Sequence, residues 1–150
     1  MLALTFPGQG SQAVGMGKEL ADTFPESRAV FEEVDEALGQ DLSKIIWEGP
    51  NDLLTSTTNA QPALMAVSIA ALRAMEAQGF RVSTAVYVAG HSLGEYSARA
   101  PAHALSIAVT DRLLRIRAEA LRAGVPGGKG WTASTHHQEP EQAQKAGNSP

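Results

Sequence analysis

The stretch Val86-Tyr87-Val88-Ala89-Gly90-His91-Ser92-Leu93-Gly94-Glu95-Tyr96-Ser97-Ala98 decides the fold of this chain. Its apolar start predicts a short strand, and the Gly-x-Ser-x-Gly pattern that follows leads into a helix. This order is typical of a nucleophile elbow, in which the hydroxyl of Ser92 is exposed at a sharp strand-to-helix turn. Gly90 and Gly94 fit such a turn, because a side chain at either position would clash where the helix crosses the strand. The unpaired N–H groups at the helix N-terminus can then stabilise an oxyanion that forms beside the serine.

A second motif stands near residue 1. Leu2-Ala3-Leu4-Thr5-Phe6 predicts a buried strand, and the loop Pro7-Gly8-Gln9-Gly10-Ser11-Gln12 follows it. A glycine-rich loop that leaves a strand can present backbone N–H groups to an anion. Each motif by itself also fits an ordinary turn, but the two together favour acyl chemistry on a serine.

Together with two further matches, these motifs resemble the malonyl-CoA:acyl-carrier-protein transacylases and the related acyltransferase domains of fatty acid and polyketide synthases. The further matches are the run Asn59-Ala60-Gln61-Pro62-Ala63-Leu64 and the segment Leu113-Leu114-Arg115-Ile116-Arg117, which is followed by Val125-Pro126. The order and spacing agree with the family from residue 1 to about residue 133.

The family resemblance implies an α/β fold with an α/β-hydrolase-like core, parallel strands, helices on both faces and a ferredoxin-like insert. We therefore expect the N-terminal part of such a core, with the insert and the C-terminal half missing. Residues 1–133 would form this truncated acyltransferase core, and residues 134–150, which are polar, would form a disordered and divergent tail.

The resemblance also implies a role for each matching residue. Ser92 would take the malonyl group from malonyl-CoA as an ester and pass it to the thiol of acyl carrier protein, without a cofactor or a metal. The backbone N–H groups of Gln9 and Leu93 would form the oxyanion hole. Arg117 would bind the free carboxylate of the malonyl group, because a guanidinium matches a carboxylate bidentately and stays charged when desolvated. An acetyl group would leave Arg117 buried and unpaired, which is costly.

The other arginines of the same predicted helix have a plainer interpretation. By spacing alone, basic residues on a helix form a solvated face, and the resemblance overrides this only for Arg117. Arg115 and Arg122 would be solvated or would contact an acidic carrier protein.

The sequence shows no evident general base for Ser92. A serine nucleophile needs a base, usually histidine, within hydrogen-bond distance, and the family places it after the inserted subdomain. His91 adjoins the serine and should point elsewhere, and His103 has no identifiable partner. His136 and His137 lie in the polar tail. Without the base, turnover should fall by about a million-fold, so we expect impaired activity.

Two other functions remain open. The chain could be a non-catalytic remnant that binds acyl-CoA or a carrier protein, or it could be a serine esterase of the broader hydrolase class. An esterase would need an acid and a histidine downstream of the serine. It would also leave the Gln9 loop and Arg117 unexplained.

Composition excludes several function classes. Of the 150 residues, 43% are hydrophobic and 19% are charged, which fits one globular domain with a core. The net charge of -4 argues against nucleic acid or an anionic membrane as the main partner. The absence of cysteine excludes disulfides and thiolate catalysis. No basic leader or membrane-length apolar run is evident, which favours the cytoplasm.

Hydrophobic periodicity, glycines and prolines predict a mainly helical chain. The expected helices cover residues 16–24, 25–38, 41–47, 62–78 and 107–123, and the second expected strand covers residues 85–89. The helix that opens at Pro62 is apolar almost all round in its first turns and should be buried.

The sequence also departs from the family pattern at several positions. Pro101 should end or kink the helix after the elbow, and Ala108 and Val109 stand where acidic residues would favour a helix N-terminus. Only two strands are predicted, so the sheet should have an open edge and some helices should expose apolar faces. We therefore expect marginal stability or self-association.

Overall fold

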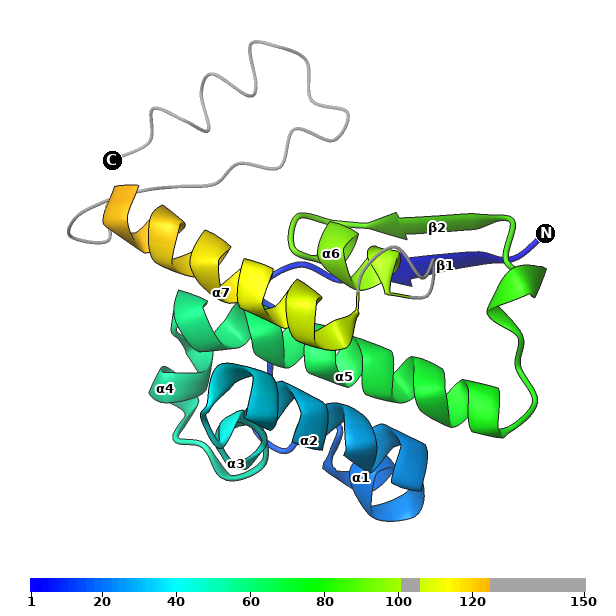
Figure 1. Cartoon of the computed structure of the whole chain (residues 1–150), viewed down its shortest axis with the longest axis horizontal. Helices are drawn as coiled ribbons and strands as arrows, with labels where there is room; N and C mark the ends of the chain where they lie inside the picture. The colour runs from blue at the N-terminus through cyan, green and yellow to red at the C-terminus, as the bar shows by residue number, and fades with distance from the viewer. Residues whose placement is uncertain (101–105, 125–150) are drawn as a thin grey trace, which may run out of the picture.

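The computed structural model of the chain describes residues 1–100 and 106–124. It shows an α/β arrangement in which most of the described residues are helical and the sheet is small. Two strands, β1 (Ala3–Phe6) and β2 (Tyr87–Gly90), pair in parallel, with Phe6 opposite Gly90. The helices lie to one side of this strand pair (Figure 1). They are α1 (Lys18–Thr23), α2 (Pro25–Leu38), α3 (Leu42–Glu48), α4 (Asn51–Thr55), α5 (Thr57–Ala77), α6 (Gly94–Arg99) and α7 (Ile107–Gly124), with a 3₁₀ turn at Val82–Thr84.

The core is built around α5, which packs against α2 and α7 while these two also contact each other. Its buried positions are rich in alanine, which lets the neighbouring helices approach closely. Met65 and Ile69 of α5 are 0% exposed, and they join Phe31 of α2 and Leu114 of α7 in one hydrophobic cluster. Each such side chain contributes roughly 1.5–3 kcal/mol on burial. The expected burial of this helix is confirmed.

The start of α5 differs from the prediction. The helix begins at Thr57, so Pro62 lies inside it and does not open it. The carbonyl of Ser56 accepts hydrogen bonds from the amides of Asn59 (2.9 Å) and Ala60 (2.8 Å), which starts the first turn before the proline. Pro62 removes one helical hydrogen bond, but its side chain is buried with the rest of this part of α5. The short helix α4 was not predicted.

The strands are less buried than predicted. In β1, Ala3 and Thr5 are exposed and only Phe6 is buried, and in β2 Tyr87 is 62% exposed. The physical reason is that the described part of the chain supplies two strands and covers one side of them. The second strand also begins at Tyr87, later than predicted.

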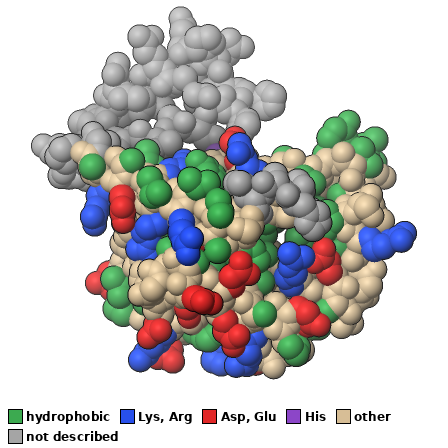
Figure 2. All heavy atoms as spheres, in the orientation of Figure 1, with side chains coloured by type: hydrophobic (Ala, Val, Ile, Leu, Met, Phe, Trp, Pro, Cys, Tyr) green, Lys and Arg blue, Asp and Glu red, His purple; other side chains and the backbone are tan. Residues whose placement is uncertain are grey.

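Apolar side chains reach the surface beside the sheet and along α7. Val109, Leu113 and Ile116 recur at helical spacing and are 41%, 39% and 61% exposed. Figure 2 shows hydrophobic surface over α7 and around the N-terminal end of the strands. The expected open edge and exposed helix face are therefore present in the described residues. Self-association through them stays a prediction.

Several sequence predictions fall outside the described residues: the effect of Pro101, the histidines at 103, 136 and 137, and the tail from 134 to 150. The boundary at residue 133 likewise stays a prediction. No described helix combines the length and the hydropathy that crossing a membrane requires. The expected cytoplasmic location stays a prediction too.

Candidate active site

The segment from β2 to α6 has the backbone of a sharp elbow. Ser92 has a φ of 55°, and it is the non-glycine residue with positive φ in the described part of the chain. The amide of His91 donates to the carbonyl of Phe6 (3.0 Å), so the turn is tied to the end of β1. A left-handed residue with a Cβ costs roughly 1–2 kcal/mol, and such strain collects at functional sites. The predicted strand, turn and helix are therefore present around this serine.

Two glycines make this elbow possible. A Cβ on Gly90 would collide with the backbone of Gly94, and a Cβ on Gly94 would collide with the carbonyl oxygen of Phe6. The second Cβ would also lie 2.9 Å from the carbonyl oxygen of Pro7. Because all these neighbours are backbone atoms, no side-chain rotation can relieve the overlap. The predicted clash at these two positions is confirmed.

The loop after β1 meets the elbow at the same end of the sheet, because the two strands are parallel and in register. Contact is close: a Cβ on Gly8 would collide with the imidazole of His91. The amide of Gly10 donates to the side chain of Gln12 (2.8 Å). The amides of Gln9 and Leu93 donate no hydrogen bond to another described residue. The structure thus leaves two backbone donors available beside the serine loop.

Arg117 reaches the elbow from α7. Its Nη2 donates to the Oγ of Ser92 (3.0 Å), and its Nη1 donates to the Oε1 of Gln61 (2.6 Å). Among the described residues, ion pairs involve Asp22 with Lys18 and Arg28, and Arg73 with Glu76, but not this arginine. Both acceptors of its guanidinium are neutral, so its charge remains available for an anion next to the serine hydroxyl.

Gln61 is a residue that sequence reasoning gave no role. It lies on α5, is 1% exposed and fixes one arm of Arg117. The sequence signal was weak, because Gln61 precedes the predicted start of the helix at Pro62. With α5 beginning at Thr57, its amide is buried and needs a partner. Tyr96 of α6 also lies near the guanidinium, with its ring centroid 6.0 Å from the Cζ of Arg117.

The neighbouring arginines of α7 differ in exposure, with Arg115 partly buried and Arg122 exposed. The Nη2 of Arg115 donates to the Oε1 of Gln40 (2.7 Å), and its Nε is buried without a hydrogen-bond partner in the described residues. Arg115 is therefore only partly exposed, because α7 packs this side chain against the end of α2. Its contact with an acidic carrier protein stays a prediction. Arg122 is exposed, as expected.

The described residues supply no evident base for Ser92. His91 is the histidine among them, and its imidazole lies against Gly8. Within residues 1–100 and 106–124, no group of three or more histidine, aspartate or glutamate side chains is placed to hold a metal ion.

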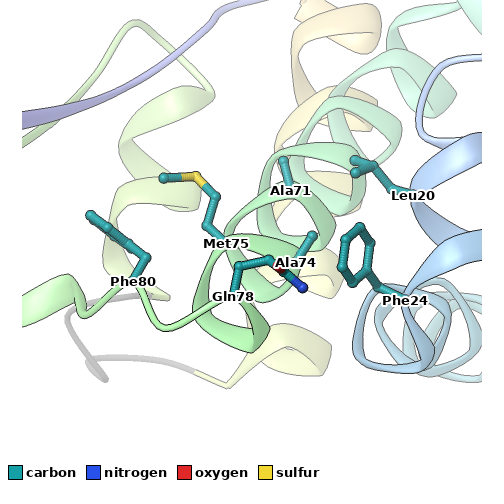
Figure 3. A pocket seen from close by; sticks show the side chains of 7 residues that line it. All are labelled: Leu20, Phe24, Ala71, Ala74, Met75, Gln78 and Phe80. Atoms are coloured by element: carbon teal, nitrogen blue, oxygen red, sulfur yellow. The ribbon is translucent and has the colours of Figure 1, made fainter.

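An apolar pocket of about 440 Å³ lies away from this site, between α1 and the C-terminal half of α5 (Figure 3). Its lining consists of Leu20, Phe24, Ala71, Ala74, Met75, Gln78 and Phe80. Gln61 and the elbow contribute nothing to it, so the pocket takes no part in the candidate site.

Residues 4–147 match the family model described as the acyl transferase domain. Among curated relatives, the malonyl CoA-acyl carrier protein transacylase of Bacillus subtilis (strain 168) is 47% identical over 133 residues, covering 89% of this chain and 41% of the relative. The enzyme of the same name from Salmonella typhimurium is 41% identical over 128 residues, covering 85% of this chain and 41% of the relative. The chain thus spans about two fifths of the length of these relatives.

Solved structures agree with these relatives. The acyl-carrier-protein-S-malonyltransferase from Bartonella henselae has a TM-score of 0.80 and 60% sequence identity, over 83% of this chain and 40% of its own. A malonyl-transacylase solved in complex with a type II polyketide acyl-carrier protein has a TM-score of 0.80 and 39% identity, over 85% of this chain and 40% of its own.

Proposed function

Because this chain belongs to the acyl transferase domain family, we propose that it carries the nucleophile and the acid-binding arginine of a malonyl-CoA:acyl-carrier-protein transacylase. The observation that carries the proposal is the hydrogen bond between Arg117 and Ser92. Malonyl-CoA is an acyl donor with a carboxylate close to its reactive thioester. It needs a cation beside the nucleophile, and the 3.0 Å contact supplies this arrangement.

The proposed reaction begins at Ser92. Its Oγ attacks the thioester carbonyl, and the amides of Gln9 and Leu93 bind the oxyanion; each donor of this kind is worth roughly 3 kcal/mol. The carbon–sulfur bond then breaks, a malonyl ester remains on the serine, and the hydroxyl proton ends on the sulfur of coenzyme A. The thiol of the carrier protein then attacks the ester carbonyl, and the bond between this carbon and the Oγ of Ser92 breaks. The malonyl group leaves as a thioester of the carrier protein, and the thiol proton ends on the serine oxygen. Malonyl-CoA is a substrate here, and the proposal needs no cofactor.

Selection for malonyl over a neutral acyl group would come from Arg117. In the described structure its two hydrogen bonds go to a hydroxyl and an amide. A malonyl carboxylate would replace the serine contact with a charge-assisted hydrogen bond, which is worth about 1.5–3 kcal/mol. Gln61 would keep the guanidinium in place during this exchange. A neutral ester gains nothing from the arginine, so the site favours an acyl transferase over an esterase.

We also propose that the described residues are the N-terminal part of an α/β-hydrolase-like core. The relatives extend well beyond the matched two fifths, and the exposed strands and the apolar face of α7 fit a core that continues. The general base would come from outside the described residues. Turnover without it should be lower by about a million-fold.

The test is intact mass after incubation with malonyl-CoA, compared between the chain and Ser92→Ala. The matched control is Ser83→Ala, which removes an exposed serine from the 3₁₀ turn before β2. A malonyl adduct that disappears in Ser92→Ala and persists in Ser83→Ala supports the proposal. Malonyl-CoA binding without any adduct would favour a non-catalytic binding protein. Hydrolysis of a neutral ester that Arg117→Ala does not change would favour the esterase.

A further inference from the structure

At the start of α7, a charged side chain is buried and an apolar side chain is exposed. Asp111 is 0% exposed, and neither oxygen of its carboxyl has a hydrogen-bond partner among the described residues. Val109, in the same turn, is 41% exposed. An amphipathic helix places these residue types the other way round. A buried carboxylate without a partner is costly when it is ionised, so this side chain needs an explanation that the proposed reaction does not give.

Neither Asp35 nor Arg115, the two charged groups that act on Asp111, forms a hydrogen bond with it. Asp35 of α2 is occupied by Ser43, whose amide and hydroxyl both donate to its carboxylate. Arg115 lies one turn further along α7 and keeps its charge, because its Nη2 donates to the neutral Gln40. Its Nε, like the Asp111 carboxyl, has no hydrogen-bond partner among the described residues. Burial raises the pKa of Asp111 most strongly, the positive charge of Arg115 lowers it and the negative charge of Asp35 raises it, to about 7.

The other charged groups of the helices packed against α7 are engaged elsewhere or exposed. On α2, the Oε1 of Glu33 accepts a hydrogen bond from the amide of Ala108 (3.3 Å), and the Nε of Arg112 donates to the carbonyl of Ala37 (3.2 Å). On α5, Arg73 forms an ion pair with Glu76. On α6, Glu95 and Arg99 are exposed. Arg115 is therefore the cation that acts on Asp111.

We propose that the interface of α7 with α2 is a proton-dependent latch, in which α7 docks firmly when Asp111 is protonated and loosens when this carboxyl is ionised. A proton turns one oxygen into a neutral hydroxyl and removes the repulsion from Asp35. Ionisation leaves a buried charge that accepts no hydrogen bond from a described residue. The charge of Arg115 only partly offsets the cost of burying it. Because the latch concerns the docking of a helix, it does not depend on the proposed transferase function.

The direction of the pH effect follows from the two states. In the folded chain the pKa of Asp111 is about 7, so the carboxyl keeps its proton up to about that pH. In the unfolded chain its pKa has the ordinary value of 3.8. The folded state therefore binds the extra proton between these values, and stability falls as pH rises through this window. From pH 5 to pH 8, linkage between the two pKa values raises the unfolding equilibrium constant by roughly a hundred-fold.

The experiment compares the unmodified chain with Asp111→Asn, which keeps the size but cannot titrate, and with Asp111→Ala. Glu119→Gln is the matched control, because Glu119 is an exposed carboxylate on the same helix. The unfolding equilibrium constant is measured by urea titration from pH 5 to pH 8, with amide hydrogen exchange of α7 at each pH.

The expected result is a roughly hundred-fold rise of the unmodified chain's unfolding constant relative to either Asp111 variant, with Glu119→Gln following the unmodified chain. Exchange in α7 should rise with it, after correction for the intrinsic pH dependence. A ratio that stays constant from pH 5 to pH 8 overturns the proposal. No acyl substrate enters the measurement, so this result is separate from the outcome of the malonyl-adduct test.

Discussion

Replacing Ser92 by glycine and by alanine gives a direct measurement of the elbow geometry. Both variants lose the hydroxyl and with it the hydrogen bond from Arg117, so the difference between them reports on the backbone alone. At a φ of 55°, alanine carries the left-handed penalty of roughly 1–2 kcal/mol. Glycine avoids this penalty but loses about 0.5–1 kcal/mol through its greater freedom in the unfolded chain. We therefore expect Ser92→Gly to be more stable than Ser92→Ala by about 1 kcal/mol.

The same pair of substitutions at an ordinary helical position should give the opposite sign. Glu32 is exposed in the middle of α2, where glycine is less stable than alanine by about 1 kcal/mol. The four variants are compared by urea unfolding at one pH, with the slopes checked for equality so that midpoints can be converted to free energies. The two positions should then differ by about 2 kcal/mol in the glycine-minus-alanine free energy.

An alanine variant at position 92 that is as stable as the glycine variant would refute the reasoning. It would mean that residue 92 does not occupy the left-handed region in solution, and the case for a nucleophile elbow would then be lost. The same conclusion would follow if glycine were less stable than alanine by an equal amount at positions 92 and 32, because the serine would then behave as an ordinary helical residue.

Three further predictions follow from single contacts. Gly94→Ala should cost at least about 3 kcal/mol, because backbone atoms must move, whereas Gly39→Ala, with open space around it and a φ of 60°, should cost about 1 kcal/mol; thermal unfolding of both variants checks this. Gln61→Leu should weaken malonyl-CoA binding at least about ten-fold, because a hydrogen bond to a charged group is lost, and leave coenzyme A binding unchanged; calorimetry with both ligands would show otherwise if the arginine holds its place unaided. Ser27→Ala should cost about 1 kcal/mol by urea unfolding, since its Oγ donates to the carbonyl of Ala70 (2.7 Å) inside the core; an unchanged midpoint would show that this bond adds nothing.

Features that depend on neighbouring residues were predictable from the sequence. The limits of α2 follow from Pro25 at its first turn and from Gly39, which has the left-handed conformation that ends the helix. The elbow follows from glycines at fixed positions around Ser92. In these cases the deciding contact is made within a few residues, so the sequence contains both partners side by side.

Features that depend on distant partners were missed. The contact of Gln61 with Arg117 joins residues far apart in the sequence, and the pattern of α5 shows only that the amide needs some partner. The N-terminus of α7, which lacks acidic residues at Ala108 and Val109, receives the carboxylate of Glu33 from α2. The start of α5 before Pro62 is another example, because its first turn is fixed by contacts with the segment that precedes it.

The burial of the strands could not be predicted either, because a run of apolar residues does not say which face a neighbour covers. This has a consequence for the candidate site. Arg117 is attached to the buried helix α5 through Gln61. Ser92 lies on the elbow after the exposed strand β2, and the amide of the preceding His91 ties this elbow to the carbonyl of Phe6. The two side chains of the candidate site therefore rest on parts of the molecule with different degrees of burial. Local opening begins where few apolar contacts are buried, so fraying at the strands should separate the serine from the arginine before α7 leaves α5. Whatever covers the exposed strands would then increase reactivity mainly by holding the elbow in place, since the arginine already has its own support.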